Sequence, residues 1–175
     1  MRWLSPHWRV PKAVWALFII EFPFTVALLA LFGIASPNLY RTKLWQEGFN
    51  HGWNSNPNIV LYSYANHRPI KTPLVWSAFV TQFNLVVSVL SMFLLLTKVT
   101  LHTLHVFWPF LSLIVHGLLI GLFGYSIYGQ TASDMSDPRY PQHGAPWYIT
   151  KSCSVSSNDD IKGYCQQAKG SLAIT

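Results

Sequence analysis

Two ionisable residues lie deep inside apolar runs of this 175-residue sequence. Glu21 belongs to a run over residues 13–35, and His116 belongs to a run over residues 106–128. At a helical rise of about 1.5 Å per residue, the two groups lie about 12 and about 15 Å from the same end of a helix bundle. A lone charge at the centre of a bilayer costs at least about 2.5–3.5 kcal/mol. We therefore expect Glu21 either to be protonated or to pair with His116, with Ser88 or Asn84 beside them.

A buried glutamate–histidine pair has two interpretations. It could handle protons or bind a ligand, or it could be a neutral, hydrogen-bonded pair with a structural role. The sequence favours the structural role, because no second acid and no chain of basic residues continues a relay across the membrane.

Other catalytic signatures are missing from the sequence. His102 and His105 have helical i, i+3 spacing, but zinc needs a third and usually a fourth ligand, and none follows nearby. Asp134 and Asp137 are too few for a calcium loop. No P-loop, GxGxxG, HExxH or GxSxG motif occurs. We therefore predict no enzymatic activity, no catalytic residue, no metal and no cofactor.

The composition determines which elements must position these residues. Hydrophobic residues make up 51% and charged residues only 10%, whereas soluble domains carry about 25% charge. The apolar residues form three runs over 13–35, 74–97 and 106–128. Each run can cross a hydrocarbon layer of about 30 Å as a helix, which satisfies its own backbone hydrogen bonds. The predicted fold class is an all-α membrane protein with a bundle of three transmembrane helices.

The first run has an alternative interpretation as a cleaved signal peptide. Basic residues precede it, and Gly33-Ile34-Ala35 resembles a small-residue cleavage site. Because the apolar stretch is much longer than the usual signal-peptide core of about 7–15 residues, we favour a transmembrane helix.

The helices divide the rest of the chain into four polar segments. We expect residues 1–12 and the short link 98–105 to be cytoplasmic, since Arg2, Arg9, Lys12 and Lys98 are concentrated there. An aromatic-rich loop over 36–73 and a loop or tail over 129–175 are then extracytoplasmic. In the loop, residues 39–49 could form a short amphipathic helix.

The two cysteines support this orientation. Cys153 and Cys165 both follow the third helix, and a disulfide between them indicates an oxidising compartment. The alternative is a pair of reduced cysteines without a role. We predict the disulfide, and an integral multi-pass protein of the plasma membrane or the secretory pathway.

A polar stripe on the second helix predicts how the helices pack. Its residues are spaced by four, three, four and three, which keeps them on one face. Lipid cannot satisfy such groups, so they should face protein. The stripe consists of Ser77, Thr81, Asn84, Ser88 and Ser91.

The third helix offers a surface of small residues. Gly117 and Gly121 form a GxxxG pair, and Gly124 continues the same face. Glycines let helix backbones approach closely, either within one chain or between two chains. We favour packing within the chain, against the polar stripe.

Three loop segments resemble a known type of protein. Residues 40–45 (YRTKLW), 144–153 (GAPWYITKSC) and 164–169 (YCQQAK) look like segments of uncharacterised fungal four-helix membrane proteins. The layout is similar to that of MARVEL-type domains, which have a cytoplasmic N-terminus and a cysteine-bearing second outer loop. The resemblance implies a fourth helix after Cys165, and residues 171–175 read like its start. Either the chain is truncated there, or it is a three-helix variant with its C-terminus outside.

Two functions remain open. The first is a non-enzymatic membrane-organising or scaffold component, which the packing stripe and the missing catalytic motifs favour. The alternative is a small transporter, a channel or an accessory subunit that uses a buried Glu21–His116 pair. Expected partners are membrane lipids, with other membrane proteins or further copies of the chain as candidates. The net charge of +6 is scattered over the polar segments and suits anionic lipid surfaces better than nucleic acid.

Overall fold

The chain folds into helices joined by connections of different lengths. The computed structural model describes residues 10–36, 38–67, 72–156 and 158–175, and among these no strand occurs. The longer helices are α1 (Pro11–Ala35), α2 (Arg41–Asn50), α3 (Pro57–Ala65), α4 (Ala78–Thr103), α5 (Pro109–Gln130) and α7 (Asp159–Ile174). Three short elements are η2 (Leu74–Trp76), α6 (Trp147–Thr150) and η3 (Cys153–Val155).

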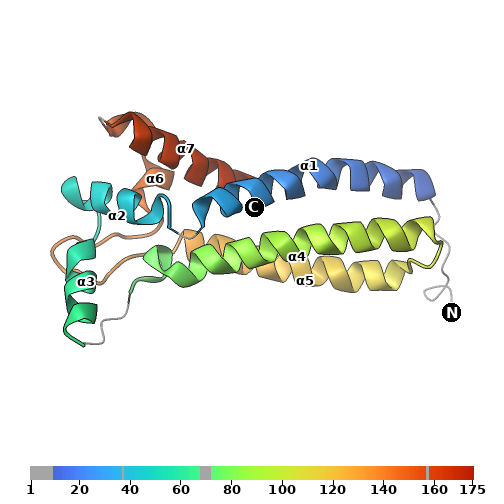
Figure 1. Ribbon diagram of the computed structural model, residues 1–175, viewed down its shortest axis with the longest axis horizontal. Helices are drawn as coiled ribbons and strands as arrows, with labels where there is room; N and C mark the ends of the chain where they lie inside the picture. Colours follow the sequence, from blue (N-terminus) through green and yellow to red (C-terminus); the bar gives the residue numbers. More distant parts are fainter. Residues whose placement is uncertain (1–9, 37, 68–71, 157) are drawn as a thin grey trace.

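Three long helices, α1, α4 and α5, lie side by side and form a bundle (Figure 1). Helices α1, α4 and α5 are each long and apolar enough to span a membrane, with mean hydropathies of 2.3, 2.0 and 1.9. The all-helical class with three such helices is therefore confirmed. Residues 1–9, most of the predicted N-terminal segment, lie outside the described residues.

The second helix differs from its predicted bounds at both ends. Residues 74–76 form the separate turn η2, and Ser77 caps α4 because its Oγ accepts a hydrogen bond from the amide of Phe79. At the other end α4 continues to Thr103. The helix therefore ends at Thr103 rather than at residue 97, and Lys98 lies inside it. The cytoplasmic placement of residues 98–105 stays a prediction. The apolar run in the sequence ends at the charge of Lys98. The helix continues beyond it, because this charge has a partner on a neighbouring helix.

Helices α1 and α4 form the main seam of the bundle. Their buried residues recur every three or four positions, which places them on one face of each helix. On α1 these are Val14, Phe18, Thr25, Leu28, Phe32 and Ala35. On α4 they are Val80, Asn84, Val87, Ser88, Ser91, Leu95, Lys98 and His102. Helix α5 buries much less, with Leu119, Ser126 and Gly129 as its buried residues.

The two long polar segments gather at one end of the bundle in what we call the cap: residues 38–67, 72–76, 131–156 and 158–175 (Figure 1). Its core is aromatic. The rings of Trp45 and Trp76 stack with centroids 5.6 Å apart and planes inclined by 2°. Trp147 is 2% exposed and packs in the same cluster. The indole nitrogens of Trp45 and Trp147 donate to the carbonyl oxygens of Ser55 and Leu44.

Helix α7 contains most of the residues that read like the start of a helix. It includes residues 171–174. That helix begins at Asp159, and Asn158 caps it by accepting a hydrogen bond from the amide of Asp160. Helix α7 packs on α1 and α2, and its far end lies beside α1 (Figure 1).

Candidate functional site: a buried ion pair and the cap

Glu21 and Lys98 form an ion pair between the two helices of the main seam. The Nζ atom of Lys98 lies 2.6 Å from Oε1 and 2.8 Å from Oε2 of Glu21. The Lys98 side chain is 2% exposed, and that of Glu21 is 25% exposed. Both carboxylate oxygens therefore contact one ammonium group, which offsets the cost of burying either charge.

His116 completes the cluster from α5. Its Nε2 lies 3.5 Å from Nζ of Lys98, and its Nδ1 lies 2.7 Å from the carbonyl oxygen of Ser112. A carbonyl can only accept, so Nδ1 carries the proton and Nε2 is the acceptor in neutral imidazole. Lys98 can then donate to Glu21 and His116 together, which uses the three hydrogens of its ammonium group.

The structure thus brings Glu21 and His116 together through a third residue. The predicted pair lies on either side of Lys98, which the sequence analysis placed outside the membrane span. A signal was present: Ser88 and Ser91 are followed by Leu95 and Lys98, which extends the same helical face. The expected nearby Ser88 instead donates to the carbonyl oxygen of Leu85.

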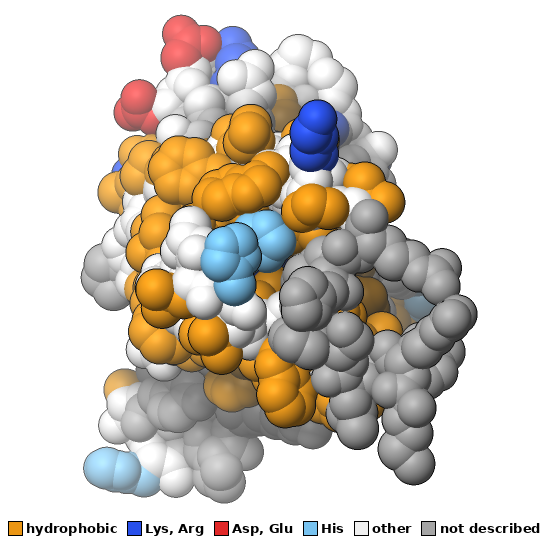
Figure 2. Space-filling view, turned by 90° about the vertical axis from the view of Figure 1, so that its right-hand side faces the viewer, with side chains coloured by type: hydrophobic (Ala, Val, Ile, Leu, Met, Phe, Trp, Pro, Cys, Tyr) orange, Lys and Arg blue, Asp and Glu red, His pale blue; other side chains and the backbone are white. Residues whose placement is uncertain are grey.

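Aromatic rings close this end of the bundle. Lys98 Nζ lies 5.9 Å from the centroid of the Phe18 ring. The imidazole of His102 packs edge-on against Trp15 and Phe18, with centroids 5.5 and 5.7 Å away. Figure 2, which views this end, shows histidine side chains among hydrophobic ones. No group of three or more metal-binding side chains occurs in the described part of the chain.

The polar stripe of α4 faces protein over most of its length. Asn84, Ser88 and Ser91 are buried, and the Oδ1 atom of Asn84 accepts a hydrogen bond from Ser126 of α5 at 2.8 Å. Thr81 is half-buried, and Ser77 is the cap of the helix rather than part of its packing face.

The GxxxG face of α5 does not pack against this stripe. A Cβ atom on Gly117, Gly121 or Gly124 would meet no heavy atom within 4 Å. The expectation of packing within the chain is therefore wrong for these three residues. The close approach occurs at Gly129, whose added Cβ would lie 3.1 Å from Val80. At about 100° per residue, Gly121 lies about 140° around α5 from Ser126 and about 80° from Gly129.

Asp134 holds three segments of the cap together. It is fully buried, and one carboxylate oxygen accepts from Ser55 Oγ and from the indole nitrogen of Trp76. The other oxygen accepts from the amide and the hydroxyl of Ser136. Backbone hydrogen bonds with Gln142 complete the site. A carboxylate with four donors is well suited to fix loop positions. Nothing in the sequence around Asp134 indicates this role.

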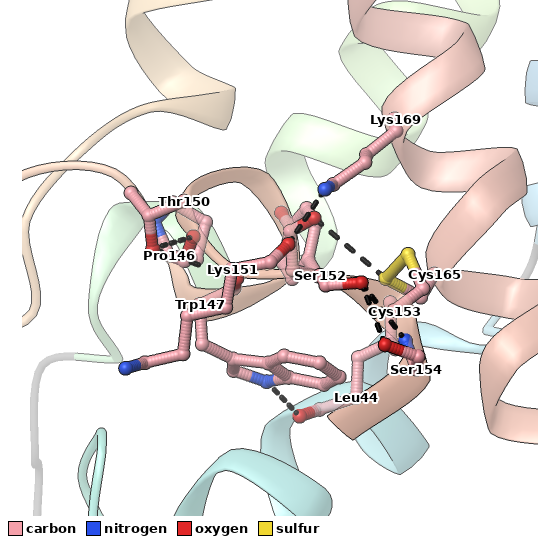
Figure 3. The surroundings of a disulfide bond; sticks show 11 residues. Leu44, Pro146, Trp147, Thr150, Lys151, Ser152, Cys153, Ser154, Cys165 and Lys169 are labelled. Carbon is pink, nitrogen blue, oxygen red and sulfur yellow. Dashed lines mark hydrogen bonds between the residues drawn. A yellow bond between two sulfur atoms is a disulfide. The ribbon is translucent and has the colours of Figure 1, made fainter. Parts of the chain in front are cut away.

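The predicted disulfide is confirmed. Cys153 and Cys165 are joined, which ties η3 to α7 (Figure 3). Nearby, Lys169 Nζ donates to the carbonyl oxygen of Lys151 at 2.6 Å, and Trp147 reaches across to Leu44 of α2. The bridge therefore pins α7 onto a surface that the tryptophans already hold in place.

The fold and these contacts define a class: an all-helical chain with three helices apolar enough to span a membrane and a disulfide-bonded cap. Within curated proteins, the chain is 48% identical over 107 residues to Kojic acid related protein 1 from Aspergillus oryzae. The match covers 61% of this chain and 40% of that relative, so the chain spans less than half of the relative's length. No family model and no solved structure matches the chain. The relative is fungal, in agreement with that part of the resemblance, while the MARVEL-type layout stays a prediction.

Proposed function

We propose that this chain is a non-enzymatic, multi-pass membrane protein that acts as a membrane-organising or scaffold component by associating laterally with copies of itself. One observation carries the proposal: α5 is buried along one face, while Gly117, Gly121 and Gly124 lie open on the other. In lipid, helices associate where small residues let backbones approach closely. Two copies can pair through this face, because each copy presents the same small-residue surface to the other.

The surroundings of the glycines support the same proposal. Large apolar side chains flank them, with Leu113 69% exposed and Ile120 73% exposed. Such a surface suits acyl chains or another apolar helix. The disulfide and Asp134 hold the cap in place. Each copy would then present a rigid cap to which further partners can bind.

Self-association in lipid tests this proposal. Two populations of the protein, labelled with donor and acceptor dyes, are mixed in liposomes, and energy transfer is measured at rising protein-to-lipid ratio. The Gly117→Ile/Gly121→Ile double variant should lose transfer and keep its melting temperature, because nothing within the chain fills these positions. A control variant on the exposed surface of α1, Ile19→Ala, should retain it, because Ile19 is 70% exposed and lies on a helix other than the one with the three glycines. A wild-type protein that stays monomeric at every ratio excludes the proposal.

The second candidate is a small transporter or an accessory subunit, and the contact of Lys98 with both Glu21 and His116 favours it. Protonation of His116 would place a second cation beside Lys98, and the carboxylate of Glu21 could then be shared between them. Proton flux into proteoliposomes should fall in Glu21→Gln if this cluster conducts. We rank this function second, because the ammonium group already has partners for its three hydrogens.

A further inference from the structure

A cavity lies where the bundle meets the cap. Its volume is about 60 Å³, enough for several waters or a compact polar group. Phe32 and Val80 line it with apolar surface, and Thr81, Asn84 and Gln130 add polar side chains. These residues come from the cap-side ends of α1, α4 and α5. The cavity therefore sits at the level where the three apolar helices end.

Arg41 contributes a charge to this cavity from the first residue of α2. Its Nη1 atom is buried and has no hydrogen-bond partner within the part of the chain that the structure describes. Burial lowers the pKa of the guanidinium from its ordinary value, but an arginine keeps its charge in proteins. The guanidinium is thus a half-buried cation whose Nη1 donors have no partner.

None of the carboxylates in the sequence neutralises Arg41. Glu21 binds Lys98, and Glu47 lies beside His51. Asp134 is held by neutral donors, while Asp137 and Asp159 lie near Arg139 and Lys162. Asp160, the sixth acid, is exposed and forms no ion pair with Arg41 among the described residues. The charge of Arg41 is therefore left for water in the cavity or for an anion from outside the chain, and only the anion neutralises it.

The lining indicates what kind of anion fits. A free inorganic anion would have to turn part of its hydrated surface toward Phe32 and Val80, which is costly. An acid group attached to an acyl chain would place its charge on Arg41 and its first methylenes on the apolar wall. The Oδ1 atom of Asn84 already accepts from Ser126, so its amide nitrogen is left to donate to the same acid group.

We propose that this cavity binds the acid head group of one anionic amphiphile, a carboxylate or phosphate ester carrying an acyl chain, with Arg41 as its charged contact. The site is separate from the α5 glycine face and from the Glu21–Lys98 pair. The cavity proposal is therefore independent of the scaffold proposal, and a result that excludes one leaves the other unchanged.

Native mass spectrometry from a neutral detergent tests the proposal, because it counts bound amphiphiles. The probes are laurate and 1-lauroyl lysophosphatidate, with monolaurin as the neutral amphiphile of equal chain length and inorganic phosphate as the anion without a chain. The stronger of the two acids identifies the head group. We expect one acid to bind at a stoichiometry of one, and monolaurin and inorganic phosphate to bind at least about tenfold more weakly.

The variants assign the contact. Arg41→Gln should weaken binding of that acid by about tenfold or more. Arg139→Gln, which removes a cap arginine that is 82% exposed, should leave binding unchanged. Arg41→Gln should also melt no lower than the wild type without ligand, since it removes an unpaired, half-buried charge. If it fails to fold, Arg41→Lys serves instead and should bind several-fold more weakly, because lysine cannot form a bidentate contact.

Four outcomes would overturn the proposal: neither acid binds the wild type, monolaurin binds as tightly as the acids, inorganic phosphate binds as tightly as they do, or the Arg41 variants bind like the wild type. The last of these would place the acid elsewhere on the protein.

Discussion

The ammonium group of Lys98 contacts both carboxylate oxygens of Glu21, although 77 positions separate the two residues in the sequence. This bidentate contact joins α1 to α4 near the end of the bundle that lies away from the cap. It explains how two charged residues can occupy helices that are otherwise apolar. It also makes their contributions to stability interdependent.

The first prediction concerns this interdependence. Glu21→Gln or Lys98→Met alone should lower the free energy of unfolding by about 3 kcal/mol, because the first leaves the buried Lys98 and the second the half-buried Glu21 without its partner. The double variant should lose much less than the sum, since a neutral pair of similar volume needs no counter-charge. Thermal or denaturant unfolding in detergent, analysed as a double-mutant cycle, measures the coupling.

Lys12→Met, near the start of the same α1, is the matched control and should leave stability nearly unchanged, because Lys12 is exposed. Additive losses in the cycle would show that the ion pair contributes no coupling and that each side chain acts through its packing alone.

Much of the bundle could be predicted from the sequence, because hydropathy and length decide which segments can cross a bilayer. The charged cluster could be predicted only in part. Depth along two helices placed Glu21 near His116, but it gave no rotation about the helix axes. Lys98 was missed because a charge at the edge of an apolar run looks the same whether it faces water or a buried carboxylate.

The glycine face illustrates the same limit. Spacing showed that Gly117, Gly121 and Gly124 share a face, but spacing cannot say which face of α5 meets α4. The choice depends on packing: Gly129 allows Val80 to approach, and the hydrogen bond between Ser126 and Asn84 fixes that side inward. The cap was still less predictable, because its contacts join residues far apart in the sequence.

The second prediction concerns Gly48 in α2. An added Cβ would lie 1.7 Å from Oδ1 of Asn54 and 2.6 Å from Cδ1 of Trp147. Both neighbours are buried, so neither can move away without disturbing the aromatic core. Gly48→Ala should therefore destabilise the cap by about 3 kcal/mol. Far-ultraviolet circular dichroism during chemical unfolding measures the loss.

Gly163→Ala in α7 is the control, since its Cβ would meet nothing within 4 Å. It should raise stability by about 0.5–1 kcal/mol through helix propensity. If Gly48→Ala behaves like this control, α2 does not approach Asn54 and Trp147 as closely as described.

The third prediction concerns Asp134. Both carboxylate oxygens of Asp134 accept hydrogen bonds. Asp134→Asn would replace one of them with an NH₂ group, which would then face the donors of Ser136 or of Trp76. We expect a loss of at least about 2 kcal/mol, because a buried donor is left unsatisfied. Hydrogen exchange should speed up in residues 131–142 and around Trp76, while the α1–α4 seam keeps its protection.

Asp137→Asn provides the comparison. Its Oδ1 accepts from the amide of Arg139, and a carboxamide oxygen can do the same. This variant should change stability little. Equal losses in the two variants would mean that negative charge in this loop matters, rather than the particular hydrogen bonds of Asp134.

The fourth prediction concerns alkaline pH and two tyrosines of the cap, Tyr40, which is buried, and Tyr148, which is partly buried. Burial raises the pKa of Tyr148 far above its ordinary value of 10.0, and burial also raises the pKa of Tyr40 despite a hydrogen bond with Ser171. Above pH 10 the unfolded chain therefore releases phenolic protons that the folded cap retains. The unfolded state then binds fewer protons, so the free energy of unfolding falls as the pH rises.

We expect the cap to lose stability progressively above about pH 10, with phenolate absorbance appearing together with unfolding rather than before it. Tyr148→Phe should reduce the slope of stability against pH in this range, because one of the two retained protons is gone. Tyr128→Phe, which alters a side chain that is 62% exposed, should leave the slope unchanged. Phenolate absorbance from Tyr148 in a cap that is still folded would show that its hydroxyl reaches water, and that the aromatic core is more open than its packing indicates.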